Sequence, residues 1–220
     1  MDNCSTKILN LFSPNGKDSG KKHPVRHGTI IIPDMSGYTR FVQSTDAETG
    51  RIITIELLSS IINSNMLNMK VSEIEGDAVL FYKQGFPIPA HCILNQFELM
   101  LQVFNEKKEE LSQRYDIEID MSLKMVAHYG SFTEYNLSGF KKLYGKVVIE
   151  SHRLLKNSIE SRCYALITDD LIAADAISSK NNKIRGLSAS KLCEVYGDMR
   201  NICFTYFDYE NANEEEKLTA

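Results

Sequence analysis

A short apolar run that ends in an acidic residue constrains this chain most. Residues 28–33 read Gly-Thr-Ile-Ile-Ile-Pro and are followed directly by Asp34. A second stretch, residues 71–81, reads as two strands joined by a turn at Gly76 and Asp77. Carboxylates at the ends of neighbouring buried strands cost free energy unless a cation lies between them. The two aspartates therefore point to paired Mg²⁺ or Mn²⁺ ions that hold a triphosphate.

The composition predicts one compact domain with tails. The chain has 220 residues, of which 43% are hydrophobic and 25% are charged, and this is enough for a single core. Residues 1–26 have the composition of a flexible segment, and residues 210–220 read as an acidic tail. We therefore expect a folded domain over residues 27–209.

Charge and cysteine content exclude several classes of protein. The net charge of -4 provides no overall basic field, so we expect no nucleic-acid partner. No stretch approaches the ~18–20 apolar residues of a membrane span, and the N-terminus lacks a signal core, so we expect no membrane partner. The five cysteines form no Cys-x-x-Cys pair, so neither a zinc site nor a disulfide framework is indicated. We expect a cytoplasmic protein with reduced, mostly buried thiols.

The order of the predicted elements indicates an α+β fold. Hydrophobic spacing and turn residues predict strands and helices that alternate along the chain. In order, they are a strand at 28–34, helices at 37–46 and 49–66, strands at 69–75 and 78–84, a helix at 88–113, strands at 117–128 and 130–142, a helix at 146–158, a strand at 163–167, a short helix after Thr168, and strands at 192–197 and 201–208. This is the ferredoxin-like βαββαβ order, with an antiparallel sheet and flanking helices.

Four motifs resemble the catalytic domain of the class III nucleotidyl cyclase family. Residues 34–39, Asp-Met-Ser-Gly-Tyr-Thr, resemble that family's Asp-x-x-Gly-Phe-Thr, and Gly76 with Asp77 matches its second hairpin. Residues 123–130 resemble the family's strand that ends in a His-x-Gly turn. Residues 143–154 resemble its dimer-interface helix. The resemblance covers roughly residues 28–170 and implies a cyclase-like fold.

The resemblance implies roles for residues of the first three motifs. Asp34 and Asp77 match the aspartates that hold two Mg²⁺ or Mn²⁺ ions in that family, although a hairpin-turn aspartate is the alternative for Asp77. Lys124 matches a basic residue that contacts the terminal phosphates, and a solvated strand lysine is its alternative. Free backbone N–H groups at the start of the following helix can receive phosphate oxygens, whereas ordinary capping by Ser36 is compatible with this; the residues concerned are Gly37, Tyr38 and Thr39.

Further matched positions concern the base and the transition state. Arg153 matches the arginine that stabilises the pentavalent phosphorus, although it could instead pair with Glu150 on the helix surface. Glu73 and Lys142 match the two residues, from opposite subunits, that select the base. Glu73 is of the guanylate type and Lys142 is of neither type, so guanine, adenine and pyrimidine bases all stay open.

Two departures from the family pattern concern turnover. The family's transition-state asparagine corresponds to Ile149, and its phosphate-gripping lysine from the second subunit corresponds to Tyr164. Loss of one such donor typically lowers a rate by ~10²–10³. Because the metal half of the site is retained and the transition-state half is altered, activity depends on whether neighbouring residues substitute.

The first hypothesis is a homodimeric cyclase that converts a nucleoside triphosphate to a 3′,5′-cyclic nucleotide and pyrophosphate. Asp34, Asp77 and Glu73 would come from one subunit, and Lys142 and Arg153 from the other. The second hypothesis is a degenerate cyclase homology domain that binds nucleotide or a protein partner without turnover. A third is a palm-type nucleotidyl transferase on the same core.

Overall fold

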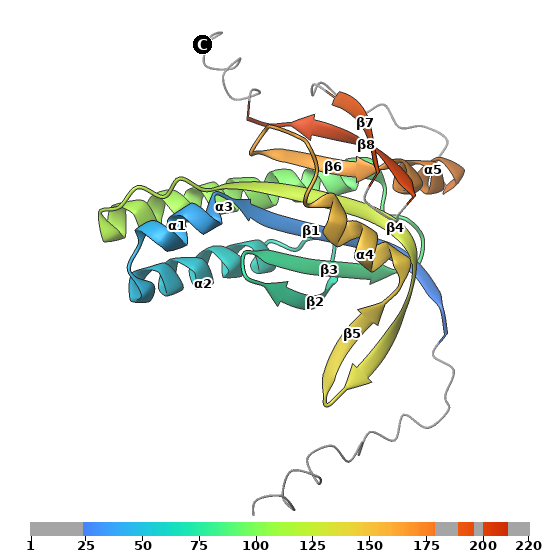
Figure 1. Cartoon of the computed structure of the whole chain (residues 1–220), viewed down its shortest axis with the longest axis horizontal. Coiled ribbons are helices and arrows are strands. Elements are labelled where there is room, and N and C mark those ends of the chain that lie inside the picture. Colours follow the sequence, from blue (N-terminus) through green and yellow to red (C-terminus); the bar gives the residue numbers. More distant parts are fainter. Residues whose placement is uncertain (1–23, 179–188, 196–199, 211–220) are drawn as a thin grey trace, which may run out of the picture.

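The computed structural model describes residues 24–178, 189–195 and 200–210 (Figure 1). The predicted flexible segment therefore lies outside the described residues up to residue 23, and the predicted acidic tail lies outside them from residue 211 onward. The first described strand, β1, begins at Arg26, one residue before the expected start of the domain.

One central sheet organises the chain. Its strands follow the order β2-β3-β1-β4-β6-β8-β7, and β5 pairs with β4 beside this path. The strands are β1 (Arg26–Ser36), β2 (Lys70–Glu75), β3 (Ala78–Gln84), β4 (Ser122–Leu137), β5 (Phe140–Tyr144), β6 (Tyr164–Thr168), β7 (Ala189–Val195) and β8 (Asn201–Asp208). The sheet is mixed rather than wholly antiparallel, because β4 and β6 run parallel.

Helices cover both faces of this sheet, and the predicted α+β class is confirmed. They are α1 (Tyr38–Ser44), α2 (Ala47–Asn63), α3 (Ala90–Tyr115), α4 (Lys146–Leu154) and α5 (Asp169–Ser178). The predicted βαββαβ order is present, with α1 and α2 together in the first helical position. Within the described ranges, no helix is long and apolar enough to cross a membrane.

Alternation along β1 explains why both faces are buried. Successive strand side chains point to opposite faces. Ile31 and Met35 join the larger core under α1, α2, α3 and α5, whereas Ile30 and Ile32 face the smaller core under α4. All four side chains are at most 1% exposed. Figure 1 shows α4 apart from the other helices, on its own side of the sheet.

The strand β4 corrects one prediction. We expected two strands with a His-x-Gly turn between them, but β4 runs without interruption from Ser122 to Leu137. Gly130 lies inside this strand, where a Cβ atom would come within 3.0 Å of the Cβ of Val147 on α4. The glycine therefore allows α4 to approach the sheet closely, and it does not form a turn.

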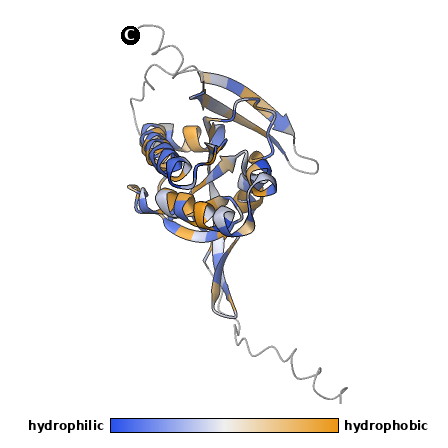
Figure 2. Ribbon diagram, turned by 90° about the vertical axis from the view of Figure 1, so that its left-hand side faces the viewer, coloured by the Kyte–Doolittle hydropathy of each residue, from blue (hydrophilic) through white to orange (hydrophobic). Residues whose placement is uncertain are grey.

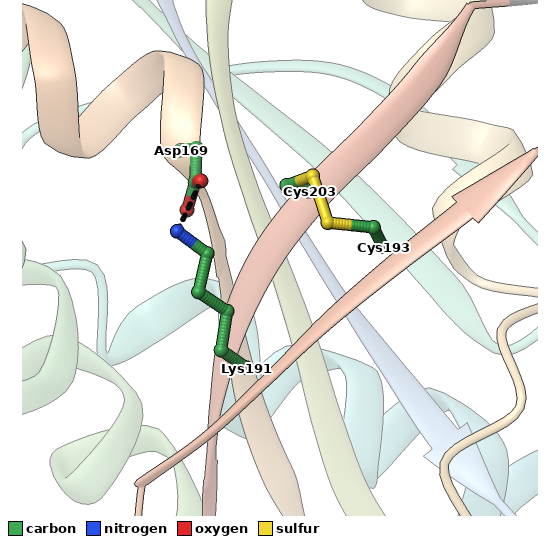
Figure 3. Close-up of a disulfide and its surroundings, with 4 residues drawn as sticks. All are labelled: Asp169, Lys191, Cys193 and Cys203. Atoms are coloured by element: carbon green, nitrogen blue, oxygen red, sulfur yellow. Dashed lines mark ion pairs between the residues drawn. A yellow bond between two sulfur atoms is a disulfide. The ribbon is translucent and has the colours of Figure 1, made fainter.

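The cysteines correct a second prediction. Cys193 and Cys203 form a disulfide between directly paired positions of β7 and β8, with their Cα atoms 4.0 Å apart (Figure 3). The expectation of reduced thiols was wrong for these two residues, because the hairpin register places them opposite each other. Cys92 and Cys163 remain free, and burial raises the pKa of both thiols.

Packing of α2 on the sheet provides a test of the core. Leu57 on α2 is fully buried, whereas Ile55 on the same helix is 49% exposed. We expect Leu57→Ala to lower the free energy of unfolding by about 2–5 kcal/mol, because it leaves a cavity in the core. The matched control Ile55→Ala should change it by less than about 1 kcal/mol. Urea unfolding followed by circular dichroism measures both, and equal losses would contradict this assignment of the core.

Candidate functional site

A cleft of about 1000 Å³ opens where β1 ends. Its walls come from the end of β1, the start of α1, the turn between β2 and β3, strand β4 and the chain at the end of α4. Six of the nine predicted site residues line it, namely Asp34, Gly37, Tyr38, Thr39, Asp77 and Lys124. The structure thus brings together predicted site residues that lie up to 90 positions apart in the sequence, from position 34 to position 124 (124 − 34 = 90).

Strand pairing brings the two aspartates into the same cleft. In the antiparallel pair of β1 and β3, Asp34 lies opposite Ala78, and Asp77 is the residue directly before Ala78, in the turn that leads into β3. The backbone N–H of Met35 donates to the carbonyl oxygen of Asp77 at 3.3 Å. Burial, and after it the negative charge of Asp34, together raise the pKa of the Asp77 carboxyl to about 6. The two carboxyl groups therefore interact electrostatically.

Lys124 supplies the nearest positive charge. It lies opposite Asp34 in the pairing of β1 with β4, and its Nζ is 3.1 Å from Asp34 Oδ2. The same Nζ donates to the carbonyl oxygen of Leu155 at 3.4 Å. One lysine does not balance two carboxylates, since the pKa of Asp77 stays raised despite it. Oxygen donors with excess negative charge fit hard divalent cations such as Mg²⁺ and Mn²⁺.

Gly37 shapes the floor of the cleft. It is the N-cap of α1 with a φ of 88°, and no side chain, including that of Ser36, caps the helix. A Cβ atom at this position would come within 2.4 Å of the carbonyl oxygen of Asp120. Asp120 in turn accepts hydrogen bonds from Arg40 at 3.0 Å and from Arg162 at 2.9 Å. These contacts hold the backbone of the glycine turn close to the sheet.

Glu73 and Lys142 lie outside the lining of the cleft. They form an ion pair within one chain, because β5 folds back beside β2. The expectation that they select the base from opposite subunits stays a prediction, and within one chain the two side chains pair with each other.

The transition-state positions lie on α4 and β6. Arg153 is exposed and does not line the cleft, and Ile149, one helical turn earlier on α4, is 57% exposed. Tyr164 is buried, and burial raises the pKa of its hydroxyl to about 12. Its hydroxyl oxygen accepts a hydrogen bond from Asn157 at 2.7 Å.

The sequence interpretation missed part of the cleft wall. Arg40, Gln43, Glu75, His152 and Lys156 all line it. For the residues around α4 a signal was present, because positions 152, 155 and 156 follow the i, i+3, i+4 spacing of one helix face. Glu75 precedes the turn that carries Asp77, so the alternation of β2 could have identified it.

His152 lies between two glutamates of β2. Its Nε2 is 3.7 Å from Glu73 Oε1, and its Nδ1 is 3.8 Å from Glu75 Oε2. The three side chains are close enough to hold a metal ion. However, Lys142 already compensates the charge of Glu73. We therefore describe this group as a charge network at the edge of the cleft.

His128 lies away from the cleft, in the middle of β4. Its Nε2 is 2.9 Å from Glu150 Oε2 and its Nδ1 is 2.8 Å from the hydroxyl oxygen of Thr168, with all three side chains buried. The hydrogen bonds from His128 and Arg200 outweigh burial and lower the pKa of Glu150 to about 2. Glu150 therefore carries a negative charge inside the protein, and it does not pair with Arg153 in any contact of the described residues.

Comparison with known proteins assigns the chain to a family. Residues 54–164, half of the chain, match a family described as "Protein of unknown function (DUF2652)". The chain belongs to this family. The DUF2652 chain is also 29% identical over 121 residues to "Uncharacterized protein Rv2561/Rv2562" of Mycobacterium tuberculosis. That match covers 52% of the DUF2652 chain, which spans only 56% of the relative's length.

Solved structures share the fold of the DUF2652 chain. The adenylyl cyclase CyaB from P. aeruginosa has a TM-score of 0.66 at 13% identity, with 84% of this chain and 95% of that chain covered. The guanylyl cyclase Cya2 has a TM-score of 0.65 at 12% identity, with 84% and 93% covered. A dimeric guanylyl cyclase domain of RhoGC from Blastocladiella emersonii has a TM-score of 0.56 at 12% identity, with 84% and 97% covered. The fold is that of class III adenylyl and guanylyl cyclase domains.

The raised pKa of Asp77 predicts how metal-free stability depends on pH. Its folded-state pKa of about 6 exceeds the ordinary value of 3.8, so the folded state keeps this proton to higher pH than the unfolded state. Stability is therefore lost as the pH rises from about 4 to about 6. Asp77→Asn should remove this dependence and raise the free energy of unfolding at pH 7.5 by about 1–2 kcal/mol, a value discounted for partial solvent exposure.

Urea unfolding between pH 4 and pH 8 in the presence of a chelator measures this effect. Glu118→Gln is the matched control, because Glu118 is exposed and lies outside the cleft. The control should leave the pH dependence of the wild type unchanged. Identical profiles for Asp77→Asn and the wild type would contradict the electrostatic conflict in the cleft.

Proposed function

We propose that this chain is a nucleotidyl cyclase, which converts a nucleoside triphosphate to a 3′,5′-cyclic nucleotide and pyrophosphate. One observation carries the proposal: Asp34 and Asp77 line the same cleft, together with Lys124, on a class III cyclase fold. Carboxylates that share a cleft favour cation binding, and divalent metal ions, which would in turn hold the phosphates of a triphosphate, are the cations that suit this cleft.

The residues of the cleft would divide the work. Asp34 and Asp77 would hold the divalent ions, which supply a Lewis acid for the ribose 3′-hydroxyl and a clamp for the phosphates when bound. Lys124 would leave Asp34 and contact the terminal phosphates, because the ions take over its role as counter-charge. The backbone N–H groups at Gly37, Tyr38 and Thr39 would receive phosphate oxygens. The reaction is intramolecular, so positioning supplies most of the rate enhancement.

A second subunit would complete this site. Arg153 is the residue proposed for the phosphorus transition state, yet it faces solvent outside the cleft of its own chain. An arm formed by β4 and β5 extends from the body in both Figure 1 and Figure 2. This arm exposes large apolar side chains, with exposed fractions of 64% for Leu137, 71% for Phe140 and 72% for Tyr144. Several large exposed apolar side chains on one arm suit a protein interface.

The structure also supports the alternative of nucleotide binding without turnover. Ile149 is exposed on α4 beside Arg153 and has no polar atom in its side chain. Tyr164, at the position of the family lysine, is buried and bonded to Asn157. The metal-binding half of the site can therefore act without the transition-state half.

Product formation decides between these two functions. The full chain is incubated with each of the four ribonucleoside triphosphates and Mn²⁺, and cyclic product is measured by mass spectrometry. We expect product with one base class, and a loss of at least ~10²-fold in Asp34→Asn and Asp77→Asn, because each removes a metal ligand. Glu118→Gln should retain wild-type activity. Mn²⁺-dependent nucleotide binding without product would favour the nucleotide-binding domain. The absence of both product and Mn²⁺-dependent binding would refute both proposed functions.

Subunit complementation tests the shared site. Asp34→Asn and Arg153→Ala should each be inactive as homodimers, whereas an equal mixture should recover about a quarter of wild-type activity, since half of the dimers are mixed and each has one intact site of two. Phe140→Asp should dissociate the dimer in analytical ultracentrifugation, because it places a charge in the apolar interface. Phe86→Asp is the matched control, since Phe86 is 87% exposed and lies outside the arm. Recovery without dimerisation would contradict the shared site.

A further inference from the structure

The helix α4 carries side chains toward three different surroundings. Arg153 and Ile149 face solvent, and His152 lines the cleft. Glu150 points the other way and is only 3% exposed. A helix of nine residues, Lys146–Leu154, has little stability of its own, so its orientation depends on tertiary contacts.

Glu150 is the charged anchor of this helix. Its Oε1 accepts a hydrogen bond from Arg200 Nε at 2.7 Å, and its Oε2 accepts one from Arg200 Nη2 at 3.3 Å. His128 on β4 contacts Oε2 at 2.9 Å, and Lys146 Nζ lies 3.6 Å from Oε1. A hollow of about 320 Å³ is lined by Lys146, Glu150 and Arg200 among others, so apolar packing does not fill this place.

Arg200 joins two helices through one guanidinium group. Besides Glu150 on α4, it donates to the two carboxylate oxygens of Asp170 on α5 at 2.7 Å and 3.1 Å. These two carboxylates raise the pKa of Arg200, so its charge is permanent. Planar, two-pronged contacts of this kind specify geometry as well as energy. Removal of Arg200 would leave the buried charge of Glu150 with weaker compensation.

The disulfide lies close to Arg200 along the chain, because Cys203 follows Arg200 by three residues. The bond between Cys193 and Cys203 closes a covalent ring around residues 194–202, and Arg200 belongs to that ring. Cys193 is exposed at the edge strand β7, so a thiol reagent in solution can reach the bond. Figure 3 shows the disulfide linking β7 and β8, with the ion pair of Lys191 and Asp169 as a second tie between this hairpin and α5.

We infer that Arg200 is a positioning residue for α4, and that the Cys193–Cys203 disulfide keeps it in place. Reduction transfers two electrons and two protons from a dithiol to the bond, which yields two cysteine thiols and the oxidised, cyclic form of the dithiol. The opened ring releases Arg200 from Glu150, and α4 loses the contact that orients Arg153. The effect on catalysis rests on the proposed function, whereas the effect on α4 does not.

Hydrogen exchange measures how firmly α4 is held in place, without any assay of activity. Arg200→Ala and dithiothreitol reduction of the wild type should each speed amide exchange in residues 146–154 by at least about tenfold, because both loosen the helix. Exchange in α2 should not change. Arg200→Lys should restore part of the protection, and reduction of Arg200→Ala should add no further effect on α4, since both changes act through one contact.

A matched control separates this contact from general loosening of the hairpin. Lys191→Ala removes the other tie to α5, the 2.7 Å ion pair with Asp169, and should leave exchange in α4 unchanged. Unchanged exchange after reduction of the wild type, or equal effects of Lys191→Ala and Arg200→Ala, would overturn the inference. Because reduction uses the wild-type chain, a variant that fails to fold does not prevent the test.

Kinetics distinguish failure of this inference from failure of the proposed function. In an active enzyme, Arg200→Ala and reduction should lower kcat by about tenfold or more while KM changes by less than about twofold, because Arg153 acts on the transition state. An unchanged kcat alongside a loosened α4 would overturn the positioning role and leave the cyclase proposal intact. A wild type without product would refute the cyclase proposal, and the exchange data would then decide the inference alone.

Discussion

The pairing of β1 with β3 on one side and β4 on the other is the constraint on which the cleft depends. It places Asp34 directly opposite Lys124 and opposite Ala78, the residue after Asp77, so that three charged residues line one cleft near the end of β1. The sheet buries both faces of β1, and the chain at this point cannot shift by one residue without turning its isoleucines away from their cores. The electrostatic conflict of the two carboxylates is therefore built into the register of the sheet.

The helix α4 contacts the sheet, a buried group of charged residues and the cleft. Gly130 lets it approach the sheet, Glu150 anchors it through Arg200 and His128, and its outer face carries Arg153 and Ile149. Its last turn lines the cleft through His152. One short helix thus connects the buried charge network, the cleft and the surface proposed for a second subunit. A change in any of these places is expected to alter the others through the orientation of α4.

The local sequence pattern was sufficient to predict most helices and strands. It failed where contacts between distant segments determined the structure. The order of strands and helices agreed with the hydrophobic period, and the first strand was predicted from a single apolar run, although β1 continues two residues beyond Asp34 to Ser36. The prediction of a turn near Gly130 was wrong, because this glycine is needed for close packing against α4, a helix that follows later in the chain. The disulfide was missed for a similar reason: the positions of Cys193 and Cys203 become informative only once the hairpin register is known.

The sequence alone determined the fold class and the first buried strand that carries Asp34, because strand period and burial follow from local residue types. The role expected for Lys124 came from the resemblance to the cyclase family and not from local pattern. Only the tertiary structure decided that Glu73 and Lys142 meet within one chain, that Arg153 faces solvent and that Arg200 holds Glu150. These outcomes depend on the side on which a hairpin folds back and on which elements pack together. Such long-range contacts depend on the packing of the whole chain, so they cannot be predicted from any short segment of the sequence.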